Sequence, residues 1–122
     1  MNLYLLAAGF LCAVVGMVHS VLGQAMIFRR TELRHALGRQ WGIVWASWHV
    51  ATVLSWAIAA GLIDLAWQAP AALEMQTHRA GCLWLAAGMA VSSFLVARAT
   101  RARHPGWMGL LGVALLLWLG VM

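Results

Sequence analysis

The sequence predicts an all-α, polytopic membrane protein, a four-transmembrane-helix bundle with both termini on the non-cytoplasmic side. Hydrophobic residues make up 64% of the 122-residue chain and charged residues only 9%, whereas soluble domains carry about 25% charged residues. Four uncharged stretches of 18 or more residues account for most of the sequence. Because a helix rises about 1.5 Å per residue, about 20 apolar residues cross the hydrocarbon layer. We therefore expect a single domain, residues 1–122, with helices at about 3–28, 40–63, 80–98 and 105–122.

The apolar stretches are continuous, which favours helices over the strands of a membrane barrel. Barrel strands alternate apolar and polar residues over about ten positions, and the sequence shows no such alternation. A cleaved signal peptide is the alternative for the first stretch, but no Lys or Arg precedes Leu3 and the apolar run is too long. We therefore expect a retained first helix and a mature chain that begins near Met1.

The arginines predict the orientation, because the chain contains no lysine. Four arginines lie in the first connection and three in the third, which share one side of a four-helix protein, and only Arg79 lies near the second. The positive-inside rule assigns the arginine-rich side to the cytoplasm, so we expect a multi-pass protein of a bacterial-type cytoplasmic (inner) membrane. The formal charge of +5 then faces anionic lipid headgroups of the bilayer. A nucleic-acid partner is not expected, since no separate basic domain exists.

The first connection, RRTELRHALGRQ, has a helical pattern of its own. Leu33, Leu37 and Trp41 recur every four residues, which predicts a short helix in the membrane interface that Gly38 ends. A polar loop is the alternative. In the third connection, Pro105 and Gly106 are placed to stop one helix and start the next.

The second connection contains a candidate metal site on the outer side. Glu74, His78 and Cys82 are spaced by four residues and share one helix face if the third helix starts early, at Pro70. Glu74 and His78 are therefore candidate metal ligands, and a Glu to His pair that caps a helix start is the ordinary alternative. Cys12 and Cys82 are not expected to form a disulfide, because their depths differ.

Small residues form stripes that predict helix packing. In lipid, small residues let helix backbones approach closely, and three glycines recur every seven residues on the first helix. We expect stripes on the second and third helices to pack against this one. The glycines of the last helix step by three, which predicts looser packing or an oligomer contact. The stripes are Gly9, Gly16 and Gly23; Gly42, Ala46, Val53, Ala57 and Ala60; Gly81, Gly88 and Ser92; and, on the last helix, Gly106, Gly109 and Gly112.

Two histidines lie inside predicted spans and are the candidate cofactor or metal ligands. His19 lies ten residues before Arg29 and His49 ten residues after Arg39, so each lies about 15 Å from its arginine and the two are level in an antiparallel hairpin. Polar residues at such depth are functional candidates. His19 and His49 would ligate haem, such as haem b, or a transition metal, or relay protons. Interhelical hydrogen bonds are the structural alternative.

Next to His49, the residues Trp41, Trp45 and Trp48 form a stripe at helical spacing. Aromatic residues gather at membrane interfaces, so we expect the stripe to face lipid and His49 to face the bundle.

No signature of an enzyme is present, because the spans contain no acid pair and the chain has no GxSxG turn or phosphate loop. The leading interpretation is a non-enzymatic accessory or assembly subunit that acts as a homo-oligomer or with a membrane protein partner. A haem- or metal-binding protein using His19 and His49 is the first alternative. A small homodimeric transporter is the second, although no span carries a charge.

Overall fold

The computed structural model describes residues 1–68 and 76–122, and within these segments the chain is helical, with no strand. This confirms the all-α prediction. The elements are α1 (Leu3–Leu22), which continues into the π-helix η1 (Gly23–Phe28), α2 (Thr31–Leu37), the 3₁₀-helix η2 (Gly38–Gln40), α3 (Trp41–Gln68), α5 (Gln76–Ala99) and α6 (Gly106–Val121).

Three helical segments are long and apolar enough to cross a membrane, namely Leu3–Phe28, Thr31–Gln68 and Gln76–Ala99. The fourth, Gly106–Val121, is also apolar but has only 16 residues. Large hydrophobic side chains are exposed along all four long helices, among them Phe10, Trp56, Trp84 and Trp118. An apolar exterior of this extent suits lipid as the surrounding solvent.

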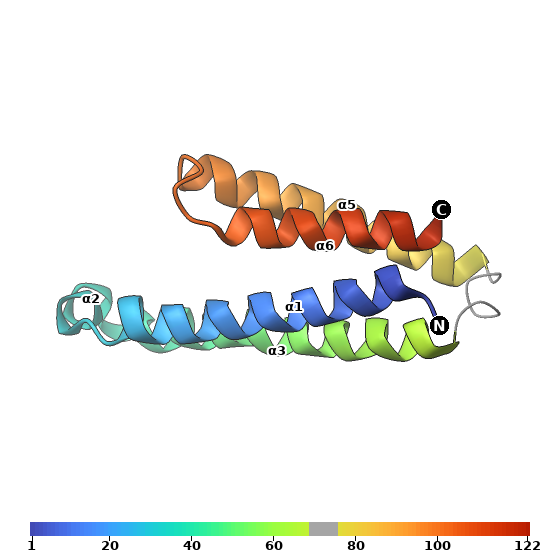
Figure 1. Ribbon diagram of the computed structural model, residues 1–122. Helices are drawn as coiled ribbons and strands as arrows, with labels where there is room; N and C mark the ends of the chain where they lie inside the picture. Colours follow the sequence, from blue (N-terminus) through green and yellow to red (C-terminus); the bar gives the residue numbers. More distant parts are fainter. Residues whose placement is uncertain (69–75) are drawn as a thin grey trace.

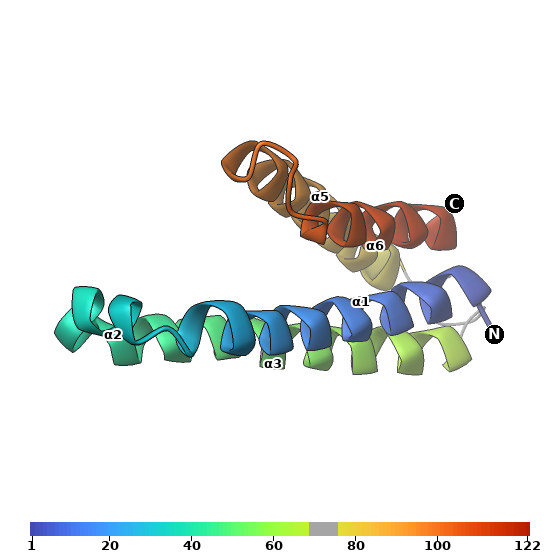
Figure 2. The ribbon, with the colours of Figure 1, turned by 60° about the vertical axis from the view of Figure 1, so that its left-hand side comes forward.

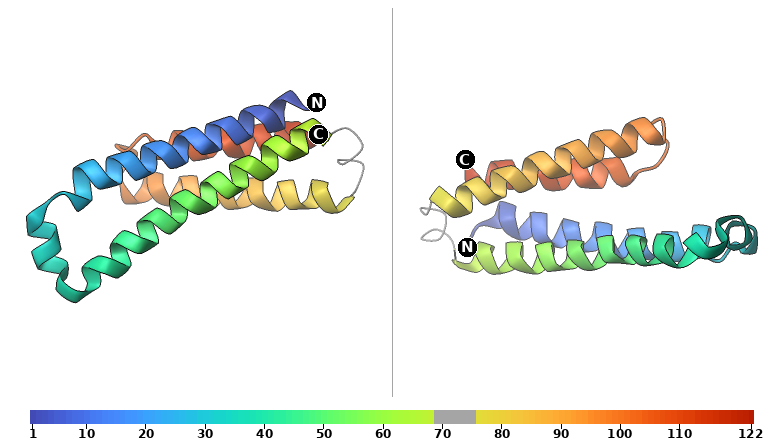
Figure 3. Two further views of the ribbon diagram at one scale, coloured as in Figure 1. Left: turned by 90° about the horizontal axis from the view of Figure 1, so that it is seen from below. Right: turned by 180° about the vertical axis from the view of Figure 1, so that it is seen from behind.

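The long helices pair as two antiparallel hairpins, α1 with α3 and α5 with α6 (Figure 1). Contacts between α1 and α6 join the hairpins. The N- and C-termini lie at one end of the molecule, while α2 and the turn between α5 and α6 lie toward the other (Figures 1 and 3). The hairpins separate toward the end that carries α2 (Figure 2).

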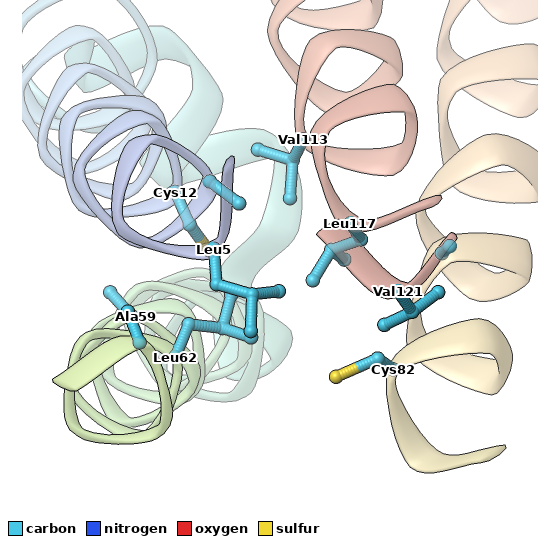
Figure 4. Packing of buried hydrophobic residues seen from close by; sticks show 11 residues of the cluster. Leu5, Cys12, Ala59, Leu62, Cys82, Val113, Leu117 and Val121 are labelled. Carbon is cyan, nitrogen blue, oxygen red and sulfur yellow. The ribbon is translucent and has the colours of Figure 1, made fainter. Parts of the chain in front are cut away.

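The hydrophobic core explains this separation, because it lies only at the end that holds the termini. There all four long helices contribute buried side chains (Figure 4). Toward the other end, the buried residues are few, and Thr52 and Ser93 among them are polar. The two hairpins therefore share a core at one end only. The core residues are Leu5, Ala8, Cys12, Ala59, Leu62, Ala66, Cys82, Ala86, Val113, Leu117 and Val121.

Asn2 ties the helix ends together at this end of the molecule. Its Oδ1 accepts hydrogen bonds from the backbone N–H groups of Tyr4 and Leu5, which caps α1. Its Nδ2 donates to the Gly120 carbonyl of α6 at 2.6 Å, and its backbone N–H donates to the Ala66 carbonyl of α3 at 2.9 Å. One residue thus connects three helices.

The glycine stripe of α1 lies against α3. A Cβ at Gly9 would lie 3.0 Å from the Ala59 carbonyl oxygen, and a Cβ at Gly16 or Gly23 would collide with Ser55 or Trp48. These glycines therefore allow the close approach of the two helices.

The prediction that small-residue stripes on α3 and α5 pack against the glycine stripe of α1 is wrong. Large side chains of α3 fill the space above the glycines of α1, so the predicted small-residue face of α3 points away: Gly42 meets no atom within 4 Å and Val53 is 61% exposed. On α5, Gly81 and Gly88 also meet nothing within 4 Å in the described chain. A sequence pattern can show that one face of a helix carries small residues, but it cannot show which helix packs against that face.

The expectation of a loosely packed α6 is also wrong. A Cβ at Gly109 would lie 2.6 Å from Val15, and one at Gly112 would lie 2.9 Å from Leu11. Although these glycines step by three along α6, both lie on its contact with α1, and they set an antiparallel register between the two helices.

The first connection contains a helix, α2, as predicted. Gly38 ends it with a φ of 49°, a left-handed backbone conformation that glycine adopts without strain. Pro105 and Gly106 start α6 as expected. In contrast, α3 runs to Gln68, five residues beyond the predicted end at 63, so that Asp64 lies within the helix and accepts a hydrogen bond from Gln68.

Candidate functional site

The centre of the candidate site is the contact between His19 of α1 and Trp48 of α3. The two rings are stacked, with centroids 4.0 Å apart and planes only 8° from parallel. The Trp48 indole N–H donates to the His19 carbonyl at 3.1 Å. Gly23 lies beneath the indole, where any side chain would collide with it. The missing side chain of Gly23 therefore makes room for Trp48, and Trp48 fixes the position of His19.

His49 lies on the same side of α3 and reaches the next residue of α1. Its Nδ1 lies 3.2 Å from the Ser20 hydroxyl, at hydrogen-bond distance. The edge of the imidazole packs on Trp45, with ring centroids 4.5 Å apart, and Phe28 approaches it from the end of the π-helix. His19 and His49 thus both lie at the α1–α3 contact, His19 through its stack on Trp48 and His49 through Ser20.

The expectation that the whole tryptophan stripe faces lipid is wrong for Trp48. This side chain lies in the contact with α1, because its indole N–H finds a backbone carbonyl there and Gly23 leaves space for the ring. Trp45 is 43% exposed but donates to Gln24 at 3.2 Å, and Trp41 packs edge-on against Phe28.

Three buried polar atoms in this region have no hydrogen-bond partner within the described chain: His19 Nε2, His49 Nε2 and Thr52 Oγ1. Buried polar groups in folded proteins are nearly always paired, and exceptions often indicate a bound water, an ion or a functional role. The sequence did not predict Thr52 as a member of this region, nor the inward position of Trp48. A signal for Thr52 was its hydroxyl, three residues after His49 on α3.

A third histidine, His104, lies in the turn just before α6. Gly109 lies against Val15 and Gly112 against Leu11, so one further turn of this antiparallel register sets the start of α6 level with His19 along the helix axis. His104 Nδ1 accepts a hydrogen bond from the Gly106 N–H at 3.1 Å.

This register changes the apparent depth of His19. Relative to Arg29, ten residues further along the chain, His19 lies deep, as predicted. Relative to the turn that carries Arg101 and Arg103, it lies near the end of the second hairpin. The first hairpin therefore extends about 15 Å beyond the second, given the helical rise of about 1.5 Å per residue. Figure 1 shows that the first hairpin reaches further at the end that carries α2.

His19 also lines a groove on the surface of the first hairpin. The groove has a volume of about 390 Å³ and is wide open. Its walls are mostly apolar, and no charged side chain lines it. The lining residues are His19 from α1 and Ile43, Val44, Ser47, Trp48 and Ala51 from α3.

The rings around the two histidines are packed closely. Trp48 stacks on one face of His19, and Phe28 packs against both Trp48 and His49, whereas an iron would be bound through an imidazole nitrogen. Ligation of haem or a metal by His19 and His49 therefore stays a prediction. Within residues 1–68 and 76–122, no group of three or more His, Cys, Asp or Glu side chains is arranged to hold a metal ion.

The second candidate site, at Glu74 and His78, falls partly outside the described residues. Glu74 lies outside the described residues, so its predicted pairing with His78 is not tested. His78 is exposed near the start of α5, whereas Cys82 is buried in the hydrophobic core. Cys12 and Cys82 are both free thiols.

Comparison with known proteins gives no further guide to function. No protein-family model, no curated protein and no solved structure matches the chain.

Proposed function

We propose that the chain is an integral protein of a bacterial-type cytoplasmic membrane that works as a non-enzymatic interaction subunit. The observation that carries this proposal is the open glycine face of α5. Among the described residues, nothing lies within 4 Å of a Cβ placed at Gly81 or Gly88, whereas side chains or backbone of neighbouring helices occupy the space beside the glycines at 9, 16, 109 and 112. In lipid, helices associate through small residues that let their backbones approach.

The rest of α5 supports this proposal. Cys82, Ala86 and Ser93 form its buried face, and the opposite face exposes Trp84 at 79% and Leu95 at 59%. Large apolar side chains beside open glycines form ridges and a groove into which another helix packs. The proposed occupant is a helix of a second copy or of a membrane protein partner.

The proposed orientation puts the arginine-rich end in the cytoplasm. Seven of the eight arginines lie in or directly beside α2 or the turn between α5 and α6. Both of these segments are at the end opposite the termini (Figure 1). The positive-inside rule then places both termini outside.

Association is tested by co-expressing two copies of the full chain that carry different tags, extracting the membranes with a lipid-preserving polymer and isolating one tag. We expect the second tag, or a stoichiometric membrane protein, to co-purify. Gly88→Leu should reduce co-purification several-fold, because the side chain occupies the open face. Gly61→Leu is the matched control, since Gly61 is also an open helix glycine, on α3. A monomeric wild type without a partner contradicts the proposal.

A further inference from the structure

The turn between α5 and α6 has an unusual backbone conformation that hydrogen bonds hold in place. Arg101 and Ala102 have φ angles of 52° and 58°, in the left-handed region that residues other than glycine seldom adopt. The Ala102 N–H donates to the Ala97 carbonyl at 2.6 Å, and the Ala102 carbonyl accepts from the Trp107 indole N–H at 3.3 Å. Strained residues of this kind persist only where their surroundings fix them, and they are frequent at binding sites. The turn is therefore a rigid support for the side chains that it carries.

These side chains are positively charged, and few acidic residues are near them. Arg98, Arg101 and Arg103 are all exposed. Among the described residues, Glu32 on α2 is the one acid at this end of the molecule, because Asp64 lies near the far end of α3. The planar guanidinium group of arginine binds phosphate through two parallel hydrogen bonds. The charge and chemistry of the turn therefore favour a phosphate group as its partner.

An apolar surface of α1 lies level with this turn along the helix axis. α6 covers Val15, whose side chain lies 2.6 Å from a Cβ placed at Gly109. Val18 and Leu22 follow on the same face of α1, but α6 begins only at Gly106, and Val18 is 47% exposed. The described chain thus brings together a charged turn, residues 100–105, and an apolar surface formed by Val18 and Leu22. We call this combination the step.

The step lies about 15 Å from the outer arginines, because the first hairpin extends that far beyond the turn (Figure 1). Four arginines lie in or beside α2, at the end of this extension. If they lie among the lipid headgroups, Arg101 and Arg103 reach about halfway into a hydrocarbon layer of about 30 Å. Arginine is tolerated at such depth where headgroups and water are drawn toward it. If the turn lay at the surface instead, the exposed side chains of Met26 and Ile43 would stand in water.

We propose that the step binds an anionic phospholipid, with its phosphate on Arg101 and Arg103 and its acyl chains along Val18 and Leu22. The positive turn matches the charge of the headgroup, and the apolar surface matches the chains. Inorganic phosphate would satisfy the arginines but would leave the apolar surface uncovered. The bound headgroup lies below the level of those around α2, so the bilayer is thinner beside the second hairpin. The proposal rests on the proposed membrane location and orientation, and it is independent of the association through α5.

The test uses the full chain in detergent micelles and native mass spectrometry. Phosphatidylglycerol and phosphatidylcholine with identical acyl chains are titrated separately, and we expect saturable binding of phosphatidylglycerol alone. Arg101→Gln combined with Arg103→Gln should lower the affinity about tenfold or more, because charge-assisted hydrogen bonds are lost. The matched control, Arg34→Gln combined with Arg39→Gln, removes two exposed charges near α2 and should bind as the wild type does.

Further variants separate the parts of the proposal. Arg101→Lys combined with Arg103→Lys keeps the charge but not the paired hydrogen bonds, so its affinity should be intermediate. Val18→Gln alters the apolar surface without changing the charge and should weaken binding several-fold. Circular dichroism checks that each variant keeps its helices. Gly88→Leu should bind the lipid normally, so that a failure of the proposed association is distinguished from a failure of this site.

Three results would overturn the proposal. Equal binding of the two lipids would show that the headgroup charge is not recognised. Equal losses in the two double glutamine variants would show that the total charge matters and the step does not. Displacement of the lipid by excess inorganic phosphate would assign the arginines to a soluble anion.

Discussion

The imidazole of His19 lies flat on the indole of Trp48, with centroids 4.0 Å apart, and the indole N–H donates to the carbonyl of the same histidine. This double contact joins α1 to α3 at the end of the molecule where the hydrophobic core is missing. It therefore does two things at once: it fastens the first hairpin and it positions the imidazole in the groove.

Trp48 should be the most important single residue for the stability of this end of the hairpin. Trp48→Ala removes the stack, the hydrogen bond and the ring above Gly23, and we expect it to lower the free energy of unfolding by about 3 kcal/mol. Trp118→Ala is the control, because Trp118 is 51% exposed. Unfolding of the protein in mixed detergent micelles, followed by circular dichroism, measures both. Equal effects of the two substitutions would contradict the assignment.

Gly16 should tolerate no side chain. A Cβ there would collide with the Ser55 hydroxyl and lie 3.3 Å from Trp56, so Gly16→Val should separate α1 from α3 and destabilise the protein by about 2 kcal/mol or more. Gly61→Val carries the same change into open space and should cost well under about 1 kcal/mol. The same unfolding measurement compares them, and a similar loss for both would show that close approach at Gly16 is unimportant.

Asn2 should stabilise the end of the molecule that holds the termini. Asn2→Ala removes the cap of α1 and the bond to the Gly120 carbonyl, and loss of such a cap costs about 1 kcal/mol. Asn2→Asp keeps the cap but cannot donate to Gly120, so its effect should be intermediate. Hydrogen exchange of the first turn of α1 and of the end of α6 should rise in the alanine variant. Faster exchange confined to α1 would mean that the bond to α6 contributes nothing.

The two cysteines should be unreactive in the folded protein. Cys12 is 3% exposed and Cys82 is 5% exposed, both within the core, so a membrane-permeable maleimide should label neither until the protein is unfolded. Ala36→Cys provides a positive control, because position 36 is exposed on α2, away from the proposed association face of α5. Mass spectrometry counts the labels. Rapid labelling of Cys82 would show that α5 does not pack as described.

The orientation should follow the arginines. A periplasmic alkaline phosphatase fused after Met122 should be active, and a fusion in the turn near Arg101 should not. Moving positive charge to the termini should reduce the difference in phosphatase activity between the two fusions. An inactive fusion at Met122 with an active one at the turn would reverse the proposed topology.

Much of the architecture could be predicted from the sequence, because these features depend on residues close together in the chain. The uncharged runs predicted the helices, Gly38 predicted the end of α2, and the spacing of Arg29, His19, Arg39 and His49 predicted that the histidines lie near each other. In contrast, the stripe on α3 was assigned to the wrong face. The glycines of α1 accept the large side chains Trp48 and Ile63, and a pattern of small residues on α3 cannot reveal that preference.

Composition and helical spacing by themselves determined that the chain is helical and apolar, because burial in lipid and hydrogen bonding within a helix depend on each segment alone. Only the tertiary structure decided that the hairpins share a core at one end, that Trp48 turns inward onto His19, and that α5 keeps an open glycine face. These features depend on which helix meets which and in what register. The register is set by side-chain fit between segments far apart in the chain, such as Gly109 against Val15.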